Sequence, residues 1–212
     1  LKPLSIPCAA IFSSRAAGRR PVRLFVALDL PDPVRHAITK LIAKLQPKSR
    51  TARWIRPENL HITLKFIGHV GDEKLSPIQT ALSSIRAAQP IELHFRGMGF
   101  FPNEHRPRAF WCGIAASPNL ADLAANIDGA LVPLGVEAET RPFTPHLTLA
   151  RFKSDEGIRE IVHAATDMKS TDFGAATETN FHLYESLLKS TGAQYNRLAS
   201  FPFVGGSTAQ AH

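Results

Sequence analysis

Asn59-Leu60-His61-Ile62-Thr63-Leu64-Lys65-Phe66 is one of two stretches in which the pattern His-x-Thr-x lies inside an apolar run. The other is Thr144-Pro145-His146-Leu147-Thr148-Leu149-Ala150-Arg151. Polar and apolar residues alternate in both, which is the period of a strand with one buried face. Each histidine therefore shares a face with its threonine. Two imidazoles and two hydroxyls could then meet at one substrate, where a histidine pair can supply a base and an acid near neutral pH.

The segments around these two motif strands alternate between strand and helix patterns. Strands are expected at 22–30, 52–55, 59–67, 91–96, 109–114 and 145–152, with a hairpin over 177–203 that turns at 190–193. Helices are expected at about 33–46, 72–88, 117–133 and 155–165, the first with Asp32 as its N-cap. The repeated order predicts an α+β fold with two pseudo-symmetric lobes. Each lobe is an antiparallel sheet with helices on its outer face, and the active site lies in the cleft between the lobes.

Composition places the chain among ordinary globular proteins, with 44% hydrophobic and 20% charged residues. No apolar run approaches the about 20 residues that span a bilayer, so no membrane association is expected. The cysteines, Cys8 and Cys112, suggest neither a disulfide framework nor a metal site, which favours a reducing compartment. We therefore expect a cytoplasmic protein, or an organellar one if the N-terminal segment is a transit peptide. We also expect a monomer.

The formal net charge of +7 is concentrated before Asp29, where Lys2, Arg15, Arg19, Arg20 and Arg23 stand without any acidic residue. The remainder is close to neutral, so contacts with nucleic acid should be local rather than spread over a basic face. Residues 1–21 are open to three interpretations: a disordered extension or mis-assigned start, an organelle-targeting peptide, or a basic arm that touches RNA. A single domain over 22–203 and a frayed tail over 204–212 complete the expected organisation.

Several kinds of catalytic site lack their characteristic residues. A metal site commonly needs three or four ligands, whereas each motif offers one histidine and a threonine, which is a poor ligand. No Gly-x-Ser-x-Gly elbow and no Gly-x-x-x-x-Gly-Lys loop occurs. We therefore predict no metal and no cofactor. Phosphoryl chemistry suits the arrangement, since two histidines can serve the incoming and leaving oxygens while hydroxyls and an arginine bind the others.

The sequence resembles the 2H phosphoesterase superfamily, and within it the bacterial RNA 2′,3′-cyclic phosphodiesterases, also called 2′-5′ RNA ligase-like proteins. The resemblance covers about residues 22–203. It rests on the two motif strands, on the segments 23–29 and 53–68, and on the ending Gly192-Ala193-Gln194-Tyr195. The N-terminal tail departs from the family, whose members usually begin near the first strand.

This resemblance implies roles for matching residues. His61 would be the proton donor and His146 the proton acceptor that activates water, while Thr63, Thr148 and Arg151 would bind the phosphate. The implied reaction opens a 2′,3′-cyclic phosphate at an RNA 3′ end to a 2′-phosphomonoester without a metal. A reverse 2′-5′ ligation of tRNA halves is also known in the family.

Three alternatives stay open at the level of sequence. The first concerns Phe25, which could stack a base or pack in the core. Lys65, for which no such choice arises, is expected at a solvated end of the His61 face. The substrate could be a small cyclic nucleotide or an ADP-ribose cyclic phosphate. The chain could also be a non-catalytic module that binds RNA ends.

Overall fold

Two antiparallel sheets form the centre of the molecule. The structure is a computed structural model and describes residues 21–49, 51–87, 89–153, 157–168, 170–190 and 192–203. The first sheet has the strand order β3-β1-β8-β9, and the second has the order β2-β6-β5-β4-β7. The predicted α+β class and the two-lobed arrangement are therefore confirmed. The tails expected at 1–21 and 204–212 lie outside the described residues, apart from Pro21.

The bounds of the elements are as follows. The first sheet contains β1 (Val22–Leu28), β3 (Ile62–Val70), β8 (Asn180–Lys189) and β9 (Gly192–Pro202). The second contains β2 (Arg53–Trp54), β4 (Ile91–Phe101), β5 (Ala109–Ala116), β6 (His146–Arg151) and β7 (Asp172–Glu178). The α-helices are α1 (Asp32–Leu45), α2 (Leu75–Ser83), α3 (Asn119–Leu131) and α4 (Ile158–Thr166). Short 3₁₀ turns occupy Gln46–Lys48, Pro57–Asn59, Asp72–Lys74 and Val132–Leu134.

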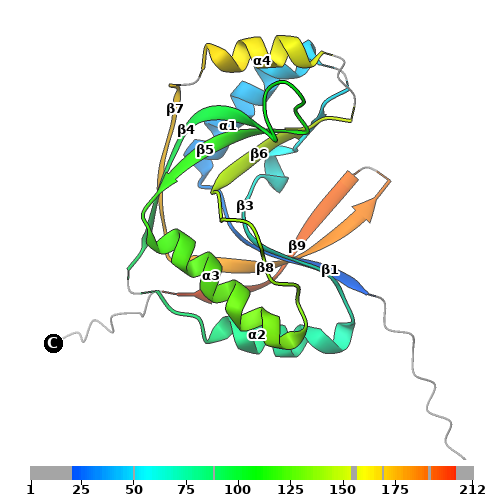
Figure 1. Cartoon of the computed structure of the whole chain (residues 1–212), viewed down its shortest axis with the longest axis vertical. Coiled ribbons are helices and arrows are strands. Elements are labelled where there is room, and N and C mark those ends of the chain that lie inside the picture. The colour runs from blue at the N-terminus through cyan, green and yellow to red at the C-terminus, as the bar shows by residue number, and fades with distance from the viewer. Residues whose placement is uncertain are drawn as a thin grey trace, which may run out of the picture.

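The helices cover the outer faces of the sheets (Figure 1). Two of them are exchanged, which means that each follows a strand of one sheet but packs on the other sheet. Helix α1 follows a strand of the first sheet but packs against β7 of the second, where α4 contacts β4. Helix α3 follows a strand of the second sheet but packs against β3 of the first, beside α2. The lobes are therefore built from interleaved segments of the chain. None of the four α-helices in the described part of the chain lies on the inner faces of the two sheets (Figure 1).

Three predicted details differ from the structure. Strand β7 was not expected, since Asp172–Glu178 contains alanine and glycine in place of a clear apolar alternation. Strand β3 continues through Gly68, whose φ of 83° is readily adopted by glycine, so the following helix starts only at Leu75. Asp32 is the first residue of α1 and not its N-cap, because Pro31 occupies the cap position.

No helix among the described residues is long and apolar enough to cross a membrane.

Candidate active site

His61 stands immediately before β3, where a 3₁₀ turn over Pro57–Asn59 delivers the chain into the strand. Its Nδ1 lies 2.7 Å from the carbonyl oxygen of Asn59. A carbonyl can only accept a hydrogen bond, so Nδ1 donates its proton. This fixes the tautomer and leaves Nε2 as the nitrogen that can exchange a proton.

His146 repeats this arrangement at the first residue of β6. Its Nδ1 lies 2.8 Å from the carbonyl oxygen of Thr144, again two residues upstream. The same argument gives the same tautomer, with Nε2 available for proton exchange. The two motifs therefore share a side-chain geometry as well as a sequence pattern.

A bulge follows each threonine, at the same position in both motif strands. On β3, Thr63 pairs with Ala27 and Lys65 with Val26, so Leu64 is the extra residue. On β6, Thr148 pairs with Trp111 and Ala150 with Phe110, so Leu149 is the extra residue. A bulge reverses the alternation of the residues beyond it. Arg151 consequently shares the inner face with His146 and Thr148. Its side chain is exposed, which agrees with this placement.

The bulge also corrects the expectation for Lys65. This residue is 6% exposed and lies on the outer face, where its Nζ pairs with Asp128 of α3 and donates to the carbonyl oxygen of Glu137 over 2.6 Å. Lys65 is therefore neither on the His61 face nor at a solvated edge. Its place on the inner face is taken by Phe66, which is 58% exposed.

The structure brings the predicted site residues together. Strands β3 and β6 are in contact, and the charges of Arg151 and His146 both reach His61. Thr63 and Thr148 are half-buried on the inner faces. Among the described residues, neither threonine hydroxyl makes a hydrogen bond to a protein partner. Both hydroxyls are thus free to donate to a ligand.

Aromatic rings hold both imidazoles. The ring centroids of Phe25 and Tyr195 lie 4.8 and 5.2 Å from the centroid of the His61 ring. The ring centroid of Phe101 lies 4.9 Å from that of His146. Phe25 is only 4% exposed and also stacks on Tyr184. Its burial favours packing, one of the two roles considered for it, and base stacking by Phe25 stays an untested prediction.

The surroundings of His61 disfavour its charged form. Burial lowers the pKa of His61 below its usual range, and the charges of Arg151 and His146 act in the same direction. The hydrogen bond to Asn59 and the charge of Asp29 oppose this shift without reversing it. In the free protein, His61 is therefore biased toward the neutral imidazole.

The turn before His61 is fixed by contacts that the sequence did not reveal. Arg35 of α1 donates to the carbonyl oxygens of Pro57 and Leu30 over 2.7 and 2.8 Å. Arg56 and Asn59 both donate to the carbonyl oxygen of Ala193 at the start of β9, over 2.7 and 2.8 Å. The β8–β9 hairpin is thus attached to this turn, and it brings Tyr195 to His61. Only the three-dimensional fold shows this, because the partners are far apart in sequence.

A polar network lies beside the aromatic cluster. Asp29 accepts hydrogen bonds from Tyr184 and Arg197, and its carboxylate is 3.7 Å from Nε2 of His182. Burial, aided by the hydrogen bond to Asp29, raises the pKa of Tyr184 to about 12. This network borders a pocket of about 790 Å³ that also reaches His61, Tyr195 and Glu58. The hollow next to the first motif is therefore lined by both aromatic and charged side chains.

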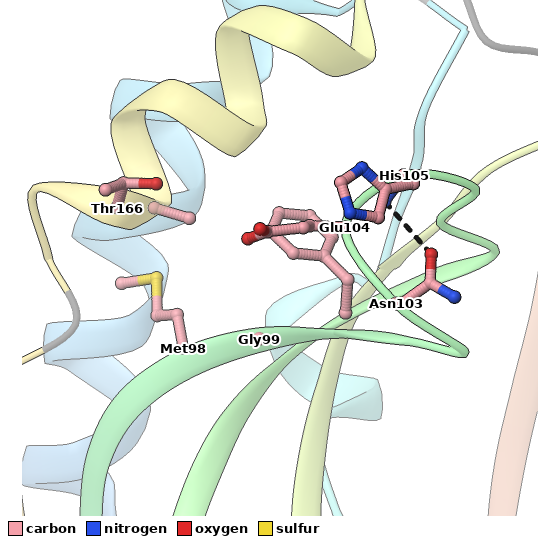
Figure 2. A pocket seen from close by; sticks show the side chains of 8 residues that line it. Met98, Gly99, Asn103, Glu104, His105 and Thr166 are labelled. Atoms are coloured by element: carbon pink, nitrogen blue, oxygen red, sulfur yellow. Dashed lines mark hydrogen bonds between the residues drawn. The ribbon is translucent and has the colours of Figure 1, made fainter.

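A second hollow of about 340 Å³ lies between β4, the loop after it and α4. Figure 2 shows Thr166 on the helix side, Met98 and Gly99 on the strand side, and Asn103, Glu104 and His105 on the loop. The Asn103 side chain accepts from the backbone N–H of His105 over 3.0 Å, which shapes the loop. None of the predicted site residues lines this hollow. No group of three or more His, Cys, Asp or Glu side chains suited to a metal ion occurs in the described part of the chain.

Two sheets that each present a His-x-Thr motif, with Arg151 on the strand of the second motif, are the arrangement expected of a phosphoesterase of the 2H superfamily. The family model described as LigT like Phosphoesterase matches residues 28–111 and 114–193. The chain belongs to this family, and the resemblance seen in the sequence is confirmed.

Relatives of known name and structure agree with this assignment. A protein of Archaeoglobus fulgidus named RNA 2′,3′-cyclic phosphodiesterase is 36% identical over 180 residues, which cover 85% of this chain and 99% of that protein. The crystal structure of TT0787 from Thermus thermophilus superposes with a TM-score of 0.71 at 31% identity, covering 85% of this chain and 97% of that one. The crystal structure of E. coli LigT complexed with 3′-AMP superposes with a TM-score of 0.69 at 28% identity, covering 86% and 98%.

Proposed function

We propose that this protein hydrolyses 2′,3′-cyclic phosphodiester ends of RNA to 2′-phosphomonoesters, without a metal, by acid–base catalysis from His61 and His146. The observation that carries the proposal is the matched anchoring of the two imidazoles, each held through Nδ1 by a carbonyl oxygen two residues upstream. Both rings thereby offer Nε2 to a substrate. The name of the A. fulgidus relative points to the same substrate.

The proposed reaction is an in-line displacement at phosphorus. Nε2 of His146 takes a proton from a water molecule as its oxygen forms a bond to phosphorus. The bond between phosphorus and the 3′-oxygen breaks, and protonated His61 gives its Nε2 proton to that oxygen. The products are a 3′-hydroxyl and a 2′-phosphate. One proton has passed from water to His146, and another has passed from His61 to the leaving oxygen.

Thr63, Thr148 and Arg151 bind the nonbridging oxygens of the phosphate in this proposal. The negative charge of these oxygens is what the site has to stabilise along the reaction path. The two hydroxyls lack protein partners among the described residues, and Arg151 is exposed on the same inner face as His146. A guanidinium can donate two hydrogen bonds to one phosphate, which makes the contact both strong and directional.

A bound phosphate also supports the acid role of His61. Burial lowers the pKa of His61 in the free protein, although an acid must carry its proton. A nearby negative charge favours the protonated imidazole. The substrate itself therefore supplies the charge that prepares His61 to act as the acid.

With the 5′-hydroxyl of a second RNA in place of water, the same site would form a bond from that oxygen to phosphorus while the bond to the 3′-oxygen breaks, which is the 2′-5′ ligation of tRNA halves predicted from the family. Small cyclic nucleotides and an ADP-ribose cyclic phosphate are the alternative substrates. Rates on a 2′,3′-cyclic mononucleotide and on a short RNA with the same end separate these substrates. A cytoplasmic location and a monomeric state stay predictions from the sequence.

The decisive experiment compares the wild type with His61→Ala and His146→Ala on an RNA that ends in a 2′,3′-cyclic phosphate. Each variant should lose about 10²–10⁴-fold in turnover, which is the usual contribution of a general acid or base. The RNA should still bind, and the wild type should form only the 2′-phosphate and keep its rate in EDTA. Full activity of either variant would refute the proposal. Binding without turnover by the wild type would instead favour a non-catalytic module for RNA ends.

A further inference from the structure

Arg53 and Arg151 stand directly opposite each other across β2 and β6. Residues that face each other in an antiparallel pair project to the same side of the sheet. Arg151 lies on the inner face with His146 and Thr148, because of the bulge at Leu149. Arg53 therefore lies on this inner face as well, one strand beyond the strand of His146, and both arginines are exposed.

This placement is electrostatically unfavourable in the protein alone. Like charges directly opposite each other on neighbouring strands destabilise a sheet. Within the described residues, neither guanidinium has an ion pair or a side-chain hydrogen bond. Nearby Arg56 differs, since its Nε lies 3.5 Å from Oε1 of Glu58 and its guanidinium donates to the carbonyl oxygen of Ala193. The positive charge of Arg53 and Arg151, beside the motif strands, is thus not balanced by any acidic side chain that the structure describes.

We propose that Arg53 binds the phosphodiester that joins the last two nucleotides of the substrate, while Arg151 binds the reacting cyclic phosphate. The inference rests on the proposed function and adds to it a subsite for a second phosphate. Neighbouring strands are about 4.8 Å apart, so the two long side chains can reach adjacent phosphates of one strand. Guanidinium groups bind phosphate through paired hydrogen bonds. The subsite selects an oligonucleotide end over a cyclic mononucleotide.

The test uses two dinucleotides that end in the same 2′,3′-cyclic phosphate. In one, the internal linkage is a phosphodiester, and in the other it is an uncharged methylphosphonate. The wild type should favour the phosphodiester by about tenfold in kcat/KM, the size of one charge-assisted contact. Arg53→Gln should abolish this preference by losing rate on the phosphodiester alone. The slope of log kcat/KM against log salt should also become shallower by about 0.7.

The matched control is Arg159→Gln, an exposed arginine on α4 outside the inner face. It removes the same charge and should keep the wild-type preference. Melting temperatures of both variants confirm that they are folded.

Two outcomes would overturn the subsite. One is a wild type that hydrolyses both dinucleotides equally well. The other is an Arg53→Gln variant that loses the same factor on both dinucleotides and on a cyclic mononucleotide, because Arg53 would then act on the reacting phosphate or on the fold.

Equilibrium binding of the same dinucleotides separates this inference from the proposed function. Tighter binding of the phosphodiester without any turnover would refute the proposed function and retain the subsite. Turnover with equal binding and equal rates would retain the function and refute the subsite.

Discussion

The two motif histidines have the same tautomer, so the different roles proposed for them must come from their surroundings. Each ring donates through Nδ1 to a backbone carbonyl oxygen, and each leaves Nε2 for the substrate. His61 packs against the rings of Phe25 and Tyr195 and lies within reach of the charge of Arg151. Its protonation should therefore respond strongly to a bound anion. This makes the pH dependence of the reaction the most informative measurement at the scale of a residue.

The alkaline limbs of kcat and kcat/KM should lie at different pH values. The profile of kcat/KM reports the free enzyme, in which burial lowers the pKa of His61, while that of kcat reports the complex. A bound phosphate raises the pKa of His61, so the alkaline limb of kcat should lie at higher pH. Rates on a 2′,3′-cyclic mononucleotide, followed over about three pH units on either side of neutrality, test this.

A variant checks independently in which direction the alkaline limb should move. Arg151→Gln removes a positive charge that lowers the pKa of His61, so it should move the alkaline limb of kcat/KM to higher pH. The two limbs coinciding in the wild type would argue against His61 as the acid.

At the scale of elements, alternation predicted the motif strands and which face holds each histidine and threonine. It could not predict the bulges at Leu64 and Leu149, since a bulge leaves no mark in composition. For this reason Lys65 and Arg151, both basic and both just past a motif, could not be told apart. The family resemblance singled out Arg151, which the structure places on the inner face, whereas Lys65 is buried on the outer face against Asp128.

The long-range contacts were also beyond the sequence. The attachment of the hairpin to the turn at Asn59, and the network around Asp29, join residues that only the fold brings together. Strand β7 was missed because its residues lack a clear period. The sequence therefore predicted which side chains share the motif faces, and the structure added the contacts that position them.

A substitution at Gly99 of β4 tests whether the packing between β4 and β5 supports the second motif. A Cβ built there would lie 2.3 Å from the indole ring of Trp111, which stands opposite Thr148. Gly99→Ala should force the ring to move, lower the free energy of unfolding by about 1–3 kcal/mol, and reduce kcat. Urea denaturation and turnover on a cyclic mononucleotide measure the two effects.

Gly129→Ala is the matched control, because a Cβ at this position of α3 meets no atom within 4 Å. It replaces glycine in a helix and should stabilise the protein by about 0.5–1 kcal/mol. Equal effects of the two substitutions would show that the contact between Gly99 and Trp111 is unimportant.

At the scale of the whole molecule, the exchanged helices connect the two sheets. Helix α3 leaves a strand of the second sheet and packs on β3 of the first, where the ion pair of Asp128 and Lys65 is located. Lys65 also holds the carbonyl oxygen of Glu137, in the segment that leads to the second motif strand. One buried lysine thus links the strand of the first histidine to the approach of the second. The two lobes are in this way joined by a buried polar contact as well as by the exchanged helices.

Removal of one partner of this buried pair should destabilise the protein more than removal of both. Lys65 is 6% exposed and the side chain of Asp128 is 22% exposed, so Lys65→Met leaves a carboxylate without its counter-charge. The free energy of unfolding should fall by about 3–5 kcal/mol, and Lys65→Met with Asp128→Leu should recover most of that loss. Exposed Lys44 on α1 provides the control, since Lys44→Met should change the stability by less than about 0.5 kcal/mol. Chemical denaturation of the four proteins decides the matter. Equal losses in the single and double variants would mean that the pair stabilises the fold through packing of the lysine chain, and that charge has no part in joining the lobes.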